Sequence, residues 1–146
     1  MNNGGVLQIL FIDPDTKWLN FAIQTLRKKG IRARCATDIG KTKRVPKFSF
    51  GPQLVFVDLE FAEKEPDQFQ YFCERGNRYV VVLFPTDLTP QQMSRVFRLG
   101  AYDCVDKPYN DKLLVDLVEA FVAEVGFSIL SPNRFTQLAS NFILVT

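Results

Sequence analysis

The stretch Gln53-Leu-Val-Phe-Val-Asp58-Leu-Glu60 joins four consecutive apolar residues, Leu54 to Val57, to a carboxylate, Asp58. A short apolar run that contains β-branched residues predicts a strand buried on both faces of a parallel sheet. In open α/β sheets, ligands bind beyond the carboxyl ends of the strands. Asp58 is therefore the first candidate for a functional residue.

Other runs along the chain predict further strands, most of which also end in polar residues. They are Val6 to Ile12 before Asp13 and Asp15, Ile31 to Ala36, Tyr79 to Phe84 before Thr86, and Asp103 to Asp106 before Lys107. The run Ile31 to Ala36 is short and alternating, which indicates an edge strand. Because the carboxyl ends of parallel strands meet at one rim, we expect the polar residues to converge there.

Helical patterns separate these strands. They extend from Asp15 or Thr16 to Gly30, from Asp67 to Arg75, from Thr89 to Gly100 and from Asp111 to Glu124, with a weaker pattern in Asp38 to Phe50. The segment Leu59 to Pro66 is expected to be an acidic loop. Strands that alternate with helices indicate right-handed βαβ units. The predicted fold class is a three-layer, doubly wound α/β sandwich with a five-stranded parallel sheet.

The apolar residues of the last two helices are expected to face the core. These residues are Met93, Val96, Phe97, Leu113, Leu114, Leu117, Val118, Phe121 and Val125.

The composition is that of an ordinary globular domain, with 146 residues, 47% of them hydrophobic and 23% charged. The absence of histidine excludes Ser-His and Cys-His nucleophile pairs and histidine-ligated zinc. The cysteines, Cys35, Cys73 and Cys104, form no CxxC pattern and are expected to be buried, reduced thiols. With no signal-like segment and no membrane-spanning run, we expect a cytoplasmic protein.

Positive charge is concentrated between Lys17 and Lys47, which contains ten Lys and Arg residues and one acid, Asp38. Such a segment either faces an acidic partner or nucleic acid, or complements a helix end and a sheet edge. We favour the second interpretation, and no direct binding of nucleic acid is expected.

The acidic residues at the predicted rim suggest a metal site. Carboxylates that lie close together repel one another unless they hold a cation or one of them takes up a proton. Mg2+ is the expected cation, because it binds through one or two carboxylates and retains waters for a phosphate. Lys107 supplies a mobile positive charge that pairs with Asp58 or with an anion that Asp58 acquires.

Three segments together resemble the receiver domain of bacterial two-component response regulators, over about Leu7 to Glu124. They are Ile9-Leu-Phe-Ile-Asp-Pro-Asp15, Leu54-Val-Phe-Val-Asp58 and Gly100-Ala-Tyr-Asp-Cys-Val-Asp-Lys-Pro108. The resemblance implies a flavodoxin-like, CheY-like sheet of strand order 2-1-3-4-5. It also implies a phosphorelay signalling domain, not an enzyme, in which a histidine kinase or phosphotransfer protein phosphorylates Asp58.

The resemblance further assigns roles around Asp58. Asp58, Asp13 and the backbone carbonyl of Glu60 would hold Mg2+, and Lys107 would pair with the phosphoryl group. A downstream effector would read the phosphorylated state. Apart from the resemblance, a homodimer through the face of the fourth and fifth units or through the C-terminal extension is a further candidate interaction.

The sequence departs from the family pattern at several of these positions. Pro14 stands where a second acid is usual, so Asp15 is either a substitute ligand or only a helix cap. Thr86 lies one or two positions after the place of the family's switch hydroxyl, and Cys104 takes the place of its switch aromatic. The loop after Asp58 lacks the usual Met-Pro.

These departures leave other functions open. The main alternative is a degenerate receiver that binds protein partners without phosphorylation. A Mg2+-dependent phosphatase is weaker, because Glu60 stands where its second aspartate would be, and no phosphate-cradling loop for a flavin follows the first strand. We assign residues 1–126 to the receiver domain and 127–146 to a C-terminal extension, either a short helix that packs on another surface or a linker stub.

Overall fold

Five parallel strands form one sheet in the part of the chain that this computed structural model describes, residues 7–40, 52–75 and 77–130 without the side chains of 127–130. The strand order is β2-β1-β3-β4-β5, which confirms the predicted fold class. The strands are β1 (Gln8–Ile12), β2 (Arg34–Ala36), β3 (Gln53–Asp58), β4 (Arg78–Phe84) and β5 (Asp103–Asp106).

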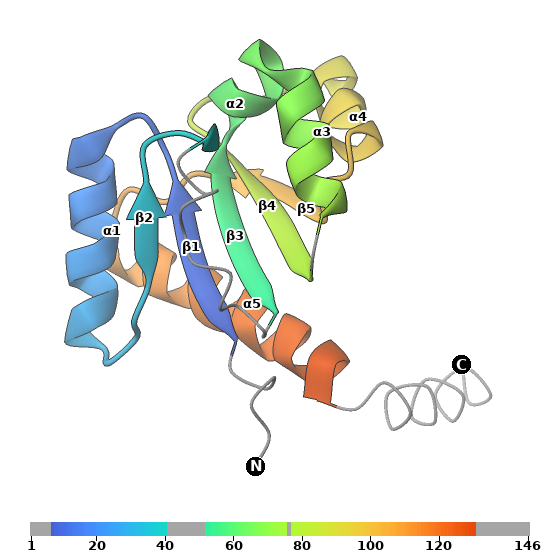
Figure 1. The fold of residues 1–146 in the computed structure, drawn as a ribbon. Coiled ribbons are helices and arrows are strands. Elements are labelled where there is room, and N and C mark those ends of the chain that lie inside the picture. The colour runs from blue at the N-terminus through green and yellow to red at the C-terminus, as the bar shows by residue number, and fades with distance from the viewer. Residues whose placement is uncertain (1–6, 41–51, 76, 131–146) are drawn as a thin grey trace.

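Helices cover both faces of this sheet, as Figure 1 shows. One face is covered by α1 (Thr16–Lys28) and α5 (Asp111–Leu130), and the other by α2 (Leu59–Lys64), α3 (Pro66–Glu74) and α4 (Pro90–Arg98). The two faces carry separate apolar cores, so the molecule has the three layers expected from alternating strands and helices.

Strand β3 lies at the centre of the sheet, and all six of its residues are buried. Successive side chains point to opposite faces, so Leu54 and Phe56 join the core under α1 and α5, while Val55 and Val57 join the other. The Phe56 ring stacks on Phe11 of β1 with 5.0 Å between ring centroids. Burial on both faces explains why the apolar run is continuous and does not alternate.

The segment after Asp58 is a helix, α2, and not the acidic loop that we predicted. The Asp58 side chain caps it, and Leu59 and Ala62 are buried three residues apart on one side of this six-residue helix. Phe61 is buried as well. The acidic residues of the segment lie on the outer side, where Glu60 pairs with Lys64 at 3.4 Å.

Some apolar residues of the last two helices face solvent, contrary to our prediction. In α4 only Val96 is buried, while Met93 and Phe97 are 39% and 42% exposed. This helix is short, and Leu88 and Leu99 at its two ends supply the rest of its contact with the core. In α5, Leu113 is 55% exposed, whereas its neighbour Leu114 is fully buried.

The cysteines are less buried than we predicted. Cys35 is exposed because it lies on the edge strand β2, and Cys73 and Cys104 are only partly buried; all three are free thiols. Burial raises the pKa of Cys73 to about 12 and that of Cys104 to about 11, so both thiols are protonated at neutral pH.

Two predicted segments lie wholly or mostly outside the described residues: the weak helix within Asp38 to Phe50, and the apolar helix of the C-terminal extension beyond residue 130. Helix α5 continues to Leu130, six residues past the predicted end at Glu124. None of the helices in the described ranges has the combination of length and apolar character that a membrane span requires.

Two adjacent leucines of α5 test this arrangement of the core. Leu114→Ala removes a fully buried side chain and should lower the free energy of unfolding by about 2–5 kcal/mol. Leu113→Ala, at an exposed position, should change it by less than about 0.5 kcal/mol. Urea unfolding followed by circular dichroism measures both, and equal losses would show that α5 is rotated from the position described.

Candidate functional site

The sheet register brings Asp13 and Asp58 to the same rim. Ile12 of β1 is paired with Val57 of β3, so each aspartate follows directly after a paired position on neighbouring strands. The Asp13 amide continues the β1–β2 ladder by donating to the Ala36 carbonyl at 3.1 Å. Both aspartates are buried, at 1% and 7% exposure, which is unusual for carboxylates without a partner.

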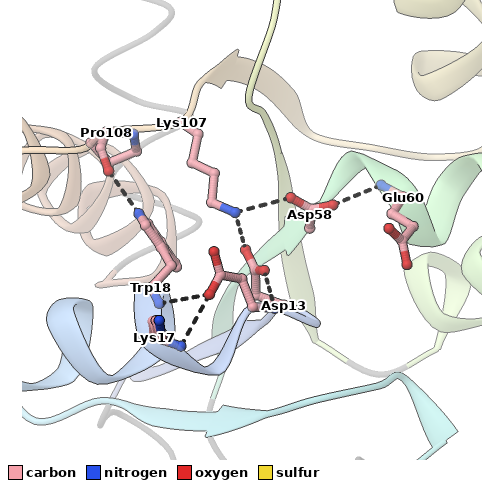
Figure 2. A network of polar contacts seen from close by, with 8 residues as sticks. Asp13, Lys17, Trp18, Asp58, Glu60, Lys107 and Pro108 are labelled. Carbon is pink, nitrogen blue, oxygen red and sulfur yellow. Dashed lines mark hydrogen bonds and ion pairs between the residues drawn. The ribbon is translucent and has the colours of Figure 1, made fainter.

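Lys107 supplies the partner for both carboxylates. Its amide donates to the Phe84 carbonyl at 2.9 Å and so places it directly beyond β5. Its ammonium Nζ lies 2.6 Å from Asp13 Oδ2 and 3.2 Å from Asp58 Oδ1, between the two side chains in Figure 2. The Lys107 side chain is only 5% exposed, so these ion pairs are largely screened from water.

The other two carboxylate oxygens are bound to main-chain amides. Asp13 Oδ1 accepts from the Asp15 amide at 2.8 Å, and Asp58 Oδ2 accepts from the Glu60 amide at 3.0 Å (Figure 2). Asp13 Oδ2 is buried, and the Lys107 ammonium, 2.6 Å away, is its polar partner. One oxygen of each aspartate therefore remains directed at a shared cation position.

The pKa values of Asp13 and Lys107 are both raised. Burial raises the pKa of the Asp13 carboxyl above its ordinary value, although the hydrogen bonds from Lys107 and the Asp15 amide oppose it. Burial alone would lower the pKa of the Lys107 ammonium, but its hydrogen bond with Asp13 and the charges of both aspartates raise it overall. Both directions fit a site in which two carboxylates face a single ammonium.

Trp18 is a member of the site that the sequence analysis did not identify. Its buried indole Nε1–H donates to the Pro108 carbonyl at 2.9 Å, and the Lys107 Nζ lies 4.7 Å from its ring centroid. Figure 2 shows the indole between Pro108 and the first turn of α1. It is the only tryptophan in the sequence, and no other feature of the sequence distinguishes it from the other apolar residues of this helix.

Asp15 and Glu60 lie beside the site without turning their side chains into it. Asp15 is exposed and caps α1, since its carboxylate accepts from the amides of Lys17 and Trp18 at 3.0 and 3.1 Å. Glu60 enters the site through its amide, while its partly exposed carboxylate pairs with Lys64. Of the two interpretations of Asp15, the structure shows the helix cap.

The residues at the expected switch positions do not contact Asp58 or Lys107 through any described hydrogen bond. Thr86 is exposed in the loop after β4. Cys104 is partly buried in β5 and packs against the core beneath α2, α3 and α4. The structure thus unites Asp13, Asp58 and Lys107 and leaves Thr86 and Cys104 apart from them.

The donor set around Lys107 suits a hard cation in part. Among the described residues, no group of three or more His, Cys, Asp or Glu side chains is arranged to hold a metal. Two carboxylate oxygens nevertheless converge on one position, and Mg2+ needs only one or two carboxylates when waters complete its shell. The carboxylates of Asp13 and Asp58 are therefore ligands of the type that Mg2+ prefers, provided that the Lys107 ammonium moves away from the position between them.

Comparisons with known proteins support the fold. A response regulator from Thermotoga maritima is similar at a TM-score of 0.65 and 18% identity, over 81% of this chain and 99% of that one. A response regulator receiver protein from Burkholderia phymatum gives a TM-score of 0.65 at 22% identity, over 81% and 96%. A putative pilus assembly-related protein from Burkholderia pseudomallei gives 0.62 at 15%, over 84% and 94%.

These likenesses establish a CheY-like receiver fold across most of the chain. No family model matches the sequence, and a search of curated proteins also finds no match. At these identities the fold is shared, whereas the chemistry has to be argued from the residues of the site.

The buried ion pairs predict a pH-dependent defect in Lys107→Met. Removing the ammonium leaves two buried carboxylates without a counterion, which should cost about 3–5 kcal/mol in the free energy of unfolding at neutral pH. The pKa of Asp13 then rises further, because Lys107 lowers it in the wild type. A raised pKa means that stability falls as pH rises from about 4 to the folded pKa, so the deficit should be larger at pH 8 than at pH 5.

Urea unfolding at the two pH values measures this effect. The double variant Asp13→Asn/Lys107→Met is the control, because it removes the ammonium together with the carboxylate closest to it. It should be less destabilised at pH 8 than Lys107→Met alone. A single variant with wild-type stability at both pH values would contradict the buried ion pairs.

Proposed function

We propose that this chain is a phosphoryl-accepting receiver that acts as a signalling switch, with Asp58 as the acceptor. The observation that carries the proposal is the convergence of Asp13, Asp58 and Lys107 at the carboxyl ends of three strands, with Lys107 bridging the two carboxylates. Two acids and a buried lysine suit phosphoryl transfer, where catalysis depends on positioning and on neutralising charge. The shared fold with response regulators agrees with this function.

In the proposed step, a carboxylate oxygen of Asp58 attacks the phosphorus of a phosphorylated donor in line. The new O–P bond forms as the bond between phosphorus and the donor's leaving atom breaks, and the leaving group departs with the electron pair. The Lys107 ammonium, which lies 3.2 Å from Asp58 Oδ1, would move from this carboxylate to the oxygens of the incoming group. With a histidine kinase as donor, the leaving group is an imidazole.

Mg2+ is part of this proposal, and Asp13 and Asp58 would hold it through the oxygens now directed at Lys107. When bound, the metal supplies charge neutralisation for the transferring phosphoryl group. The backbone carbonyl of Glu60, the third expected ligand, belongs to the first turn of α2. Helix carbonyls point toward the C-terminal end, away from the capping Asp58, so its use as a ligand requires this turn to open.

The proposed partners are a histidine kinase or phosphotransfer protein and a downstream effector. Exposed apolar side chains of α4 and of the start of α5, among them Met93, Phe97 and Leu113, offer a surface for an effector or a second copy of the chain. The proposal is of a signalling domain in the cytoplasm and not of an enzyme with a turnover substrate.

A degenerate receiver remains the second candidate, and specific residues favour it. Pro14 replaces an acid, Thr86 is exposed beside Pro85, and Lys107 already neutralises both carboxylates. The same fold also occurs in a putative pilus assembly-related protein, so the fold alone does not decide between the candidates. In this second function the chain binds protein partners without phosphorylation.

Phosphoryl acceptance is tested by intact mass after incubation with acetyl phosphate or phosphoramidate in the presence of Mg2+. The wild-type chain should gain one phosphoryl group, because Asp58 combines a carboxylate with a neighbouring ammonium. Asp58→Asn, which keeps the shape and the helix cap, should gain none. If the wild type gains no mass at high donor and Mg2+ concentrations, the degenerate receiver is the correct function.

The metal is tested by titrating Mg2+ against the fluorescence of Trp18, the single tryptophan. Asp13→Asn should abolish the response or shift its midpoint at least about tenfold, because one of only two carboxylates is lost. Asp15→Asn is the matched control, since asparagine is an equally good helix cap and removes the same charge. Equal effects of the two variants would show that Asp15 has become a ligand.

A further inference from the structure

Trp18 is held in place by three contacts. Its amide donates to the capping carboxylate of Asp15 at 3.1 Å, and its indole N–H donates to the Pro108 carbonyl at 2.9 Å. Its ring lies edge-on to Phe11 with 5.6 Å between centroids. At 5% exposure, the indole has a single fixed position between α1 and the segment after β5.

This fixed ring holds both Lys107 and its neighbour. The Lys107 Nζ lies 4.7 Å from the ring centroid, within the range of a cation–π interaction, and desolvation strengthens such a contact. The same indole binds the main chain of the next residue, Pro108 (Figure 2). One side chain of α1 thus contacts both the Lys107 ammonium and the main chain of the residue that follows Lys107.

A lysine needs such a support because its side chain is flexible. Its four-carbon stem has many rotamers, and two carboxylates alone attract the ammonium without fixing its approach. The ring face adds a third, uncharged contact to those with Asp13 Oδ2 and Asp58 Oδ1.

We propose that Trp18 is a positioning residue, whose ring face keeps the Lys107 ammonium beside Asp58, also when the ammonium yields its place between the carboxylates to a metal, and thereby sets the rate at which Asp58 accepts a phosphoryl group. The rate effect rests on the function proposed above. The placement of the ammonium does not, and it has a separate measurement.

The placement is measured by nuclear magnetic resonance without donor or metal. In the wild type, ring current should move the Cε protons of Lys107 upfield of those of the other lysines. The displacement should persist at about half its size in Trp18→Phe, which keeps a ring, and vanish in Trp18→Leu. Phe21→Leu is the matched control, because it removes a neighbouring aromatic ring of α1 and should leave the displacement unchanged.

The rate is measured with acetyl phosphate and Mg2+. Trp18→Leu should be labelled at least about tenfold more slowly than the wild type, because a desolvated cation–π contact is lost. Trp18→Phe should stay within about threefold of the wild type, and Phe21→Leu should match it. Circular dichroism verifies that each variant is folded, and Trp18→Phe decides the matter if Trp18→Leu does not fold.

Several results would overturn the inference. In the resonance experiment, these are an upfield shift of the Lys107 protons that is absent from the wild type or that persists in Trp18→Leu. In the labelling experiment, they are a wild-type rate in folded Trp18→Leu, or a tenfold lower rate in Trp18→Phe or Phe21→Leu. If the wild type is not labelled at all, the proposed function fails. The Lys107 resonances then decide the placement by themselves.

Discussion

The ion pairs of Lys107 with Asp13 and Asp58 are the contacts on which the arrangement of the site depends. Parallel pairing of β1 with β3 places two carboxylates side by side in a buried rim, where two unit charges about 4 Å apart repel by roughly 4 kcal/mol at an effective dielectric near 20. A cation must reach them from another strand. Lys107 does so because it follows directly after β5 at the same rim, where its amide donates to the Phe84 carbonyl of β4. The charge balance of the site is therefore a consequence of sheet topology.

Asp58 has a second structural task that follows from its position. Its carboxylate ends β3 and also begins α2, where it accepts from the Glu60 amide. The first turn of a helix presents free amides and a partial positive charge, so a change in the charge of Asp58 acts on α2 directly. The charge of Asp58 and the stability of the first turn of α2 are therefore linked. This contact differs from the open loop expected from the sequence, and it couples the rim to the face of the sheet covered by α2 and α3.

The strands were predictable because apolar runs of the right length specify buried parallel strands almost regardless of which residues fill them. Their order in the sheet came from the resemblance to receiver domains. We predicted a loop in place of helix α2 because the segment is rich in acidic residues, and the short helical spacing of Leu59 and Ala62 was overlooked. We predicted that Met93, Phe97 and Leu113 face the core, because helical spacing shows which residues share one face of a helix. It does not show which part of that face contacts the sheet. The contact of Trp18 with Lys107 depends on how α1 and the segment after β5 pack, and no local pattern contains that information.

The same difference explains how this fold is shared with the similar solved structures at 18–22% identity. A core position accepts any apolar side chain of similar volume, so the two apolar layers tolerate extensive substitution. A rim position supplies one charge or one hydroxyl, and replacement by proline or cysteine removes that chemistry while the core stays intact. Pro14, beside Asp13, carries no such group, whereas Asp13, Asp58 and Lys107 remain together. The proposed phosphoryl chemistry therefore rests on these three charged groups.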